Sequence, residues 1–460
     1  MNDQDFESNL TKFIRHIDSI HDTLPLTLSL YNSFAKQAQQ ALNKFIDTKA
    51  EKIVDKDGKP GVALGPEDLK MFDALESNAA ISSLAGKVIP SSLFVSLISQ
   101  YDAFLNRLLR HLFKLQPEML NNSDRNLTFS QLVEMKDIED AREYIIGKEV
   151  ETVLRKSHSE QFDYLESKLK IELRKNLPIW STFIEITERR NLLVHCDGVV
   201  SSQYIKVCTS NGIATSAKVG EELLVSVEYF KIAYLALYEI CCKLTHTLWR
   251  KFLPEQLEEA DDSLNSICFK LLLNRSFKLA DILLEFACKQ KKHSNDQSKS
   301  IFIINAALSC YLQEQNEEAM GRLRQKDWSS SSFTFKLAVS IIEGKYQDAY
   351  QWMRRIGPDG EVKKLAYQEW PLFTKIREEE EFKLIYQDLF KEDFKVIEIP
   401  QRPIFQLMSK LKEDKKNNDS TYKEGDTEIK TSSPSKPKFK RISKHSTSTG
   451  TTESNSKPQD

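Results

Sequence analysis

Apolar residues recur every three or four positions through most of this chain, the spacing that places them on one face of an α-helix. The longest apolar stripe covers residues 93–113, and a second strongly apolar segment covers 227–252. Residues 138–176 predict one long charged helix or a pair of helices, and Pro178 starts a helix over 179–195. Because only 14 glycines and 14 prolines interrupt 460 residues, the sequence predicts an all-α fold with long helices.

The amino-terminal region predicts helices separated by a turn. Residues 6–54 have a spacing that fits two helices, with Pro25 placed to start the second. The turn at 55–61 begins with the acidic spacing of a calcium loop, but the other oxygen ligands are missing, so a solvated turn is favoured. Helical spacing resumes over 66–115, and we assign residues 1–80 to a helical amino-terminal extension.

The middle of the chain predicts a helical bundle over residues 85–252. A polar connector at 121–126 precedes a short helix near 129–135. Residues 199–208 are rich in β-branched and aromatic side chains and have the composition of a strand. With 223–227 as a second short piece, they predict a small hairpin or an extended loop.

Short helix pairs are expected over residues 263–395, after a boundary marked by the acidic run 255–262. Three turns there each precede a helix that carries a small residue: Ala280, Ala319 and Ala349. This pattern resembles tetratricopeptide-like hairpins, in which alanine lets two helices approach closely. The alanines are 39 and 30 residues apart, off the family's period of about 34, so the repeats are degenerate. Stacked pairs present a concave surface, which predicts an unidentified protein partner or trigger here.

The last segment, residues 411–460, consists mainly of Ser, Thr, Lys, Asn and Pro and has almost nothing to bury. It therefore predicts a disordered tail. Its basic residues gather around Phe439, where a solvated tail is favoured over an electrostatic tether to RNA: Lys436, Lys438, Lys440, Arg441 and Lys444.

Composition limits the class of protein. A net charge of −2 gives no global field that attracts a polyanion, so any nucleic-acid contact needs a local basic surface. The seven cysteines have no C-x-x-C spacing and indicate reduced thiols. The amino terminus is polar and acidic, and no uninterrupted apolar run approaches the roughly 18 residues that span a bilayer. We therefore expect a cytoplasmic protein with no membrane segment.

One charged, helix-compatible segment ends in Arg190, Asn191 and His195 and is followed by the helix-ending pair 197–198. Its Arg-Asn-x-x-x-His spacing resembles the signature of the HEPN superfamily of all-helical domains, whose active members are metal-independent ribonucleases. A second match to the family's looser arginine–histidine spacing, at 15–21, lacks the adjacent asparagine. The amphipathic segments on both sides of the later match also favour it.

The resemblance implies RNA cleavage by transesterification, in which the ribose 2′-OH attacks the neighbouring phosphorus and the 5′-oxygen leaves, with no metal or cofactor. His195 would be the acid/base residue, since imidazole titrates near working pH. Arg190 would hold the scissile phosphate and stabilise the charge on its non-bridging oxygens. Asn191 and Glu188 share a helix face with His195 and would orient the imidazole or the phosphate.

Helix geometry argues against a site made by one straight helix. At about 100° per residue, Arg190 and His195 lie roughly 140° apart around the axis. The reach of arginine, a distorted last turn or a second copy of the motif must bring them to one phosphate. In the HEPN family the motif helices of two subunits face one cleft, so the resemblance implies a homodimer.

Five basic residues near the motif are candidates to bind the RNA backbone, although a solvated face explains them equally well: Arg189, Lys168, Lys170, Arg174 and Lys175. His158 is expected in the same bundle and near the site, but such a residue is more often a polar surface residue. In a purely structural interpretation, Arg189 and Arg190 pair with acids on their own helix while His195 ends the helix near its carbonyl groups.

Two other chemistries are disfavoured. A zinc site could combine Cys242 and His246, four residues apart on a helix, with residues 195–197, but no second paired motif supports it. A nucleophilic pair of Cys196 and His195 is weaker still, because adjacent helix residues point apart.

These patterns together predict a dimeric, metal-independent endoribonuclease with a HEPN-like domain at 85–252. HEPN nucleases joined to interaction domains resemble toxins or antiphage effectors that cut cellular RNA when triggered. The rival hypothesis, from another class of protein, is a non-catalytic helical scaffold in which both parts bind protein.

Overall fold

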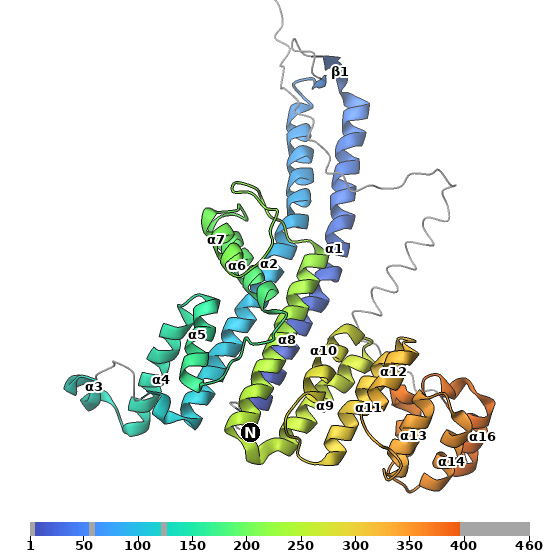
Figure 1. Ribbon diagram of the computed structural model, residues 1–460. Helices are drawn as coiled ribbons and strands as arrows, with labels where there is room; N and C mark the ends of the chain where they lie inside the picture. Colours follow the sequence, from blue (N-terminus) through green and yellow to red (C-terminus); the bar gives the residue numbers. More distant parts are fainter. Residues whose placement is uncertain (1–4, 55–59, 121–126, 396–460) are drawn as a thin grey trace, which may run out of the picture. The chain divides into compact units, whose positions relative to one another are not determined.

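The computed structural model describes residues 5–54, 60–120 and 127–395, and Figure 1 shows the order of their helices. The described chain is all-α, as predicted, apart from one antiparallel pair of four-residue strands. The predicted tail at 411–460 and the polar connector at 121–126 lie outside the described residues. So does the beginning of the predicted turn, up to Lys59.

Two long helices, α1 (Phe6–Lys49) and α2 (Leu69–Leu115), each contribute to two compact units. Within the described residues, one unit contains residues 23–90, and the other combines residues 5–22 with residues from 91 to 395. The division therefore falls near residues 22 and 90, whereas the sequence placed the end of an amino-terminal extension at residue 80.

The prediction of two helices over residues 6–54 was wrong, because α1 runs through Pro25 without a break. Proline removes one helical hydrogen bond, but its fixed φ is itself close to the helical value. A helix with helix-forming residues on both sides can therefore continue, as α2 does through Pro90. In α1 the Thr27 hydroxyl also donates to the carbonyls of Thr23 and Leu24.

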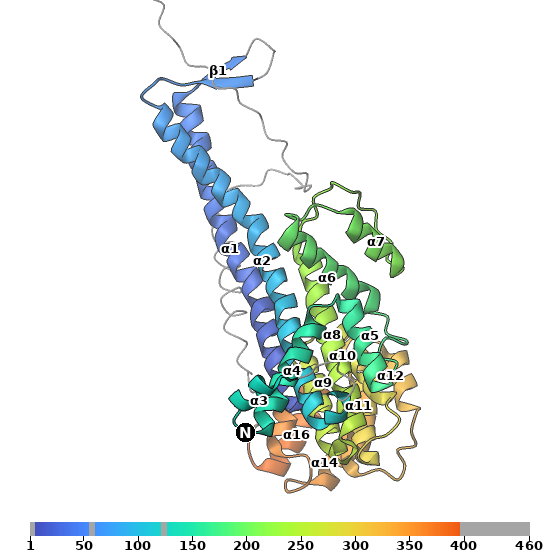
Figure 2. The same cartoon turned by 90° about the vertical axis from the view of Figure 1, so that its left-hand side faces the viewer.

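The unit of residues 23–90 is a helical hairpin closed by strands β1 (Glu51–Val54) and β2 (Pro60–Ala63), in which Glu51 pairs with Ala63 (Figure 2). Few of its apolar side chains are buried. Both helices instead expose large apolar residues: Leu30, Tyr31, Phe34, Met71, Ile81, Leu84 and Val88.

The apolar composition of α2 is relevant to the prediction that the chain has no membrane segment. Among the described helices, α2 is long and apolar enough to cross a membrane, with a mean hydropathy of 1.6 in its most apolar 18-residue window. Core helices of soluble proteins pass the same test, so one such helix is weak evidence. Of that window, 22% is buried in the structure, and the cytoplasmic location stays a prediction.

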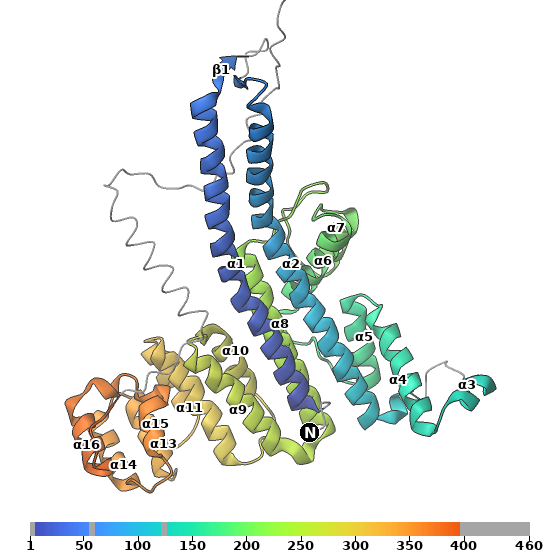
Figure 3. The same ribbon diagram turned by 180° about the vertical axis from the view of Figure 1, so that it is seen from behind.

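The second unit is built on the start of α1, the later part of α2, and α8 (Val227–Phe252), which Figures 1 and 3 show side by side. Phe13 of α1 packs on Phe104 of α2, with ring centroids 5.0 Å apart. Phe6 stacks on Trp249 of α8 at 5.9 Å. Burial of these aromatic rings holds the three helices together.

Five shorter helices complete this part of the unit: α3 (Phe129–Glu134), α4 (Ile138–Leu154), α5 (His158–Leu169), α6 (Trp180–His195) and α7 (Ser202–Ser210). They confirm the short helix near 129–135, the helix pair within 138–176, and the motif helix. The strand-like interpretation of 199–208 was wrong, because α7 forms there. Only one isolated bridge, between Val199 and Glu222, has β character among the described residues of this region.

Helix pairs follow, as predicted: α9 (Leu257–Leu273), α10 (Phe277–Cys288), α11 (Asp296–Leu312), α12 (Asn316–Leu323), α13 (Phe333–Ile342), α14 (Tyr346–Ile356), α15 (Lys364–Glu369) and α16 (Glu380–Phe390). Ala280, Ala319 and Ala349 are fully buried in the second helix of three successive pairs. Five residues before each alanine, the turn holds a residue with positive φ: Arg275, Glu314 and Gly344. The three pairs thus repeat one turn geometry despite their unequal sequence spacing.

The acidic run expected to mark a boundary belongs instead to a packed element, because α9 begins at Leu257. Asp261 of this helix is 1% exposed. Its carboxylate accepts hydrogen bonds from Arg250 of α8 at 2.6 Å and from the Ser294 amide at 2.8 Å. His293 Nδ1 lies 3.2 Å from the same carboxylate. This buried cluster ties the bundle to the helix pairs.

Candidate functional site

The motif helix α6 ends at His195, as the sequence predicted, and Asp197 and Gly198 follow it. The amides of Cys196 and Gly198 both donate to the carbonyl of Leu192, at 2.8 and 3.0 Å. Asp197 and Gly198 have φ values of 50° and 79°, in the left-handed region that reverses the chain. The Leu223 amide then donates to the Gly198 carbonyl at 2.9 Å, which fixes the segment that follows.

Gly198→Ala should destabilise the protein by about 1–3 kcal/mol, because a left-handed backbone and a close carbonyl both oppose a side chain. A Cβ at Gly198 would lie 3.0 Å from the Leu223 carbonyl oxygen. Gly212 has a φ of 68° but no heavy atom within 4 Å of such a Cβ, so Gly212→Ala is the matched control. Urea denaturation should place the midpoint of Gly198→Ala below that of Gly212→Ala; equal midpoints would contradict the steric argument.

Glu185 of α6 fixes the motif helix against its neighbours. Its carboxylate accepts hydrogen bonds from the hydroxyls of Tyr204 (α7) at 2.7 Å and Tyr229 (α8) at 2.6 Å. Arg189 pairs with the same carboxylate at 2.8 Å and lies over the Tyr229 ring. Burial, together with the Glu185 charge, raises the pKa of both tyrosine hydroxyls, so both remain donors at neutral pH.

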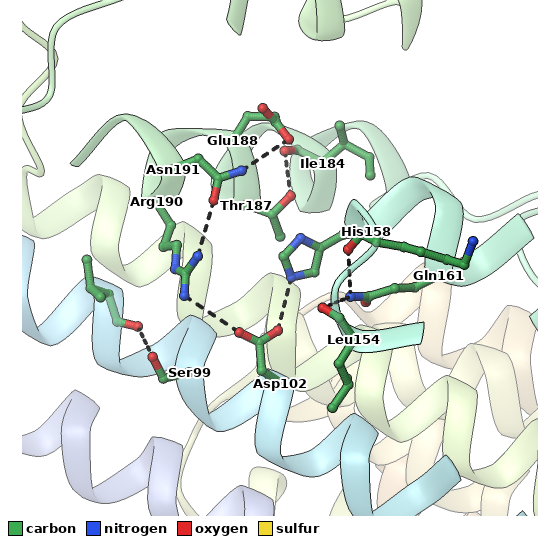
Figure 4. A network of polar contacts seen from close by, with 12 residues as sticks. Ser99, Asp102, Leu154, His158, Gln161, Ile184, Thr187, Glu188, Arg190 and Asn191 are labelled. Atoms are coloured by element: carbon green, nitrogen blue, oxygen red, sulfur yellow. Dashed lines mark hydrogen bonds and ion pairs between the residues drawn. The ribbon is translucent and has the colours of Figure 1, made fainter. Parts of the chain in front are cut away.

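Three of the four predicted catalytic residues meet in one polar network around Asp102 of α2 (Figure 4). Arg190 Nη2 lies 3.9 Å from the Asp102 carboxylate. Its Nη1 donates to Asn191 Oδ1 at 3.2 Å. The Asn191 amide in turn donates to Glu188 at 3.4 Å. The structure therefore brings Arg190, Asn191 and Glu188 together on one side of α6.

The network is partly buried, and partial burial strengthens the electrostatic interactions among its charged groups. Burial raises the pKa of the Glu188 carboxyl, against the opposing effects of His158 and of the hydrogen bond from Asn191. The Arg190 side chain is 26% exposed, yet its Nε is buried and has no hydrogen-bond partner among the described residues. The exposed part of the guanidinium leaves its positive charge open to an anionic oxygen.

His158, which sequence reasoning favoured as a surface residue, belongs to this network. It is the first residue of α5 and is 8% exposed. Its Nε2 lies 3.1 Å from Asp102 Oδ1. The same carboxylate therefore faces both His158 and Arg190, as Figure 4 shows.

His195 lies outside the network. It is the last residue of α6, and its side chain is exposed. Its imidazole forms no hydrogen bond or ion pair with any described residue. A single chain thus groups Arg190 with Asn191, Glu188, Asp102 and His158, and leaves the predicted acid/base histidine at the end of the helix.

Most of the basic residues predicted to bind RNA have partners within the chain. Arg189 is held by Glu185 and Tyr229, as described above. Lys168 donates to the Met119 carbonyl at 3.3 Å, and Arg174 pairs with Asp163 at 2.7 Å and with Glu166. Lys175 pairs with Glu172 at 2.6 Å. Lys170 is exposed at the end of α5 and forms no ion pair within the described part of the chain.

The alternative zinc site finds no support in the structure. Across residues 5–54, 60–120 and 127–395, no group of three or more His, Cys, Asp and Glu residues is arranged to hold a metal ion. Cys242 and His246 are both fully buried in α8, and burial, aided by the Arg250 charge, lowers the pKa of His246 to about 3. All seven cysteines lie in the described part of the chain and are unpaired.

The sequence did not identify Asp102 as a site residue, because nothing in the local sequence links it to Arg190, 88 positions later. One signal was available: Asp102 is an acid within the apolar stripe of 93–113, where a buried charge needs a partner. Only the packing of α2, α5 and α6 supplies the partners, His158 and Arg190.

Comparison with known proteins gives no further guide to this site. No family model matches the chain, and neither a curated protein nor a solved structure matches it. The function must be inferred from the residues and their geometry.

Proposed function

We propose that this protein is a metal-independent endoribonuclease of HEPN type that cleaves RNA by 2′-OH transesterification. The observation that supports it most is the Arg190 guanidinium, which is partly exposed and is held in place by Asn191 and Asp102. A planar guanidinium with several N–H donors suits a phosphodiester, whose non-bridging oxygens gain negative charge as the reaction proceeds.

The position of His195 supports a site shared by two copies of the chain. His195 is exposed and lies apart from the Arg190 network. A second motif helix facing the first would place one copy's His195 beside the other copy's Arg190. In this homodimer His195 is the acid/base residue, and Asn191 and Glu188 orient the phosphate or the imidazole.

The helix pairs from α9 to α16 are the proposed regulatory part. Stacked helix pairs bind partners along their surfaces, and here they follow the bundle directly through the Asp261 cluster. In the role we propose, a regulated toxin or antiphage effector, a trigger bound there releases RNA cleavage. The tetratricopeptide-like character of the pairs is part of this proposal.

The test is incubation of purified protein with total RNA in the presence of a chelator. We expect cleavage that survives chelation and leaves 2′,3′-cyclic phosphate and 5′-hydroxyl ends. Arg190→Ala and His195→Ala should each abolish it. Cleavage that needs a divalent ion, or that persists in both variants, would contradict the proposal.

A second candidate function, the non-catalytic scaffold, is favoured by a cavity in the helix pairs. The cavity measures about 250 Å³ and lies among α9, α11 and α13. It combines apolar rings with amides: Phe269, Phe335 and Trp370 with Asn265, Gln297 and Asn305. If the protein cuts no RNA, either as purified protein or when it is expressed in a bacterial host, the scaffold function is the one that remains.

A further inference from the structure

The Asp102–His158 pair is built in the way that orients a reactive imidazole. Asp102 lies on α2 and His158 on α5, so packing of two helices fixes their 3.1 Å contact. The aromatic rings of Tyr101 and Phe183 flank the imidazole, with centroids 5.6 and 5.9 Å away. The ring therefore has little freedom to rotate away from the carboxylate.

The carboxylate also selects the tautomer. Asp102 accepts a hydrogen bond only if His158 Nε2 carries the proton, which leaves Nδ1 with an unshared pair. Nδ1 has no hydrogen-bond partner among the described residues. Figure 4 shows the ring between Asp102 and the α6 side chains of Thr187 and Glu188, in the same network as Arg190.

We propose that His158 is a second acid–base residue of the site and that Asp102 is its positioning residue. The inference rests on the proposed ribonuclease function and extends it. His158 Nδ1 removes the proton of the ribose 2′-OH as the bond from O2′ to phosphorus forms. The bond from phosphorus to the 5′-oxygen breaks, and protonated His195 supplies the proton that this oxygen takes up.

The surrounding charges suit this role. Two acids lie beside the imidazole: Asp102 of α2, 3.1 Å from Nε2, and Glu188 of α6, which interacts with the ring electrostatically. Arg190 on α6, which shares the Asp102 carboxylate, and Tyr101 on α2, whose ring contacts the imidazole, are the other titratable or charged groups that the contacts place beside it. The cost of a second cation beside Arg190 is offset because the Asp102 carboxylate faces both.

A pH profile of kcat/KM on a labelled RNA tests the assignment. Two histidines that act as base and acid give a bell-shaped profile. His158→Gln should lower the maximum by about 100-fold or more and remove the rise on the acidic side, and His195→Gln should remove the fall on the alkaline side. Asp102→Asn should lower the rate with the overall fold retained, because it favours the wrong tautomer.

The controls separate this role from a structural one. His16 is exposed and contacts Gln100 rather than the network, so His16→Gln should leave the profile unchanged. If His158→Gln lowers the rate equally at every pH and keeps both limbs, His158 is structural and the proposal is wrong while the ribonuclease stands. If the wild-type protein cleaves no RNA under any condition, the ribonuclease function and this role fail together.

Discussion

Arg190→Lys should slow RNA cleavage by about 100-fold or more, although lysine keeps the positive charge. The arginine directs Nη1 toward Asn191 and Nη2 toward Asp102, and each of these nitrogens carries a second N–H. Lysine carries its three donors on one nitrogen, so it does not reproduce the planar guanidinium that reaches Asn191, Asp102 and a phosphate oxygen from separate nitrogens. Because the loss concerns charge that develops during the reaction, kcat should fall more than KM rises. Initial rates on a labelled RNA measure both.

The chain supplies a matched control in its second match to the motif spacing. Arg15 lies six residues before His21 on α1 and is exposed. Arg15→Lys should leave the cleavage rate within about twofold of wild type. Circular dichroism should show equal helix content in both variants. A rate for Arg190→Lys as high as that of Arg15→Lys would remove the arginine from the mechanism.

Much of the helical fold follows from the spacing of apolar residues. The motif helix and α8 were predicted close to their observed bounds, because each buries one continuous face, and the helix pairs were predicted as a region over 263–395. The buried alanines of the pairs were also predictable, since each follows a turn by five residues. The positive φ at Arg275 and Glu314 within two of these turns was not predictable, because neither residue is a glycine.

The two wrong assignments have different causes. At Pro25, the expectation that a proline marks a helix boundary was wrong, because proline weakens a helix without having to end it. For α7, the β-branched composition led to the wrong prediction of a strand. A helical pattern was also present in the sequence, because Val200, Tyr204 and Cys208 recur every four residues and pack with Leu192. Ser201 also caps the helix by accepting from the Tyr204 amide. Helical periodicity outweighed strand propensity there.

The residues of the candidate site also fall into a group that the sequence could predict and a group that it could not. Arg190, Asn191 and Glu188 are near neighbours on one helix, so the sequence could group them. Asp102 and His158 join them only through the packing of three helices, and no local pattern encodes that packing. His195 lies at the helix end, and whether it meets an Arg190 depends on a second copy of the chain, which a single sequence does not specify.

Asp261→Ala should lower the free energy of unfolding by about 3–5 kcal/mol, because it leaves the Arg250 charge buried without its partner. The two side chains are 1% and 8% exposed. Although burial acts to raise it, hydrogen bonds from His293, the Ser294 amide and Arg250 hold the pKa of Asp261 well below its usual value of 3.8. Urea denaturation at pH 7, followed by tryptophan fluorescence, measures the loss.

The pH dependence supplies an independent check on the same cluster. Since the folded-state pKa of Asp261 is depressed, its stabilisation is fully present above the unfolded value of 3.8 and is lost as pH falls below it. The gap between wild type and Asp261→Ala should therefore narrow below about pH 4. The neighbouring Asp262 is exposed, so Asp262→Ala should change stability by no more than about 0.5 kcal/mol. Equal losses at the two positions would mean that the helix dipole, rather than the buried cluster, needs the charge.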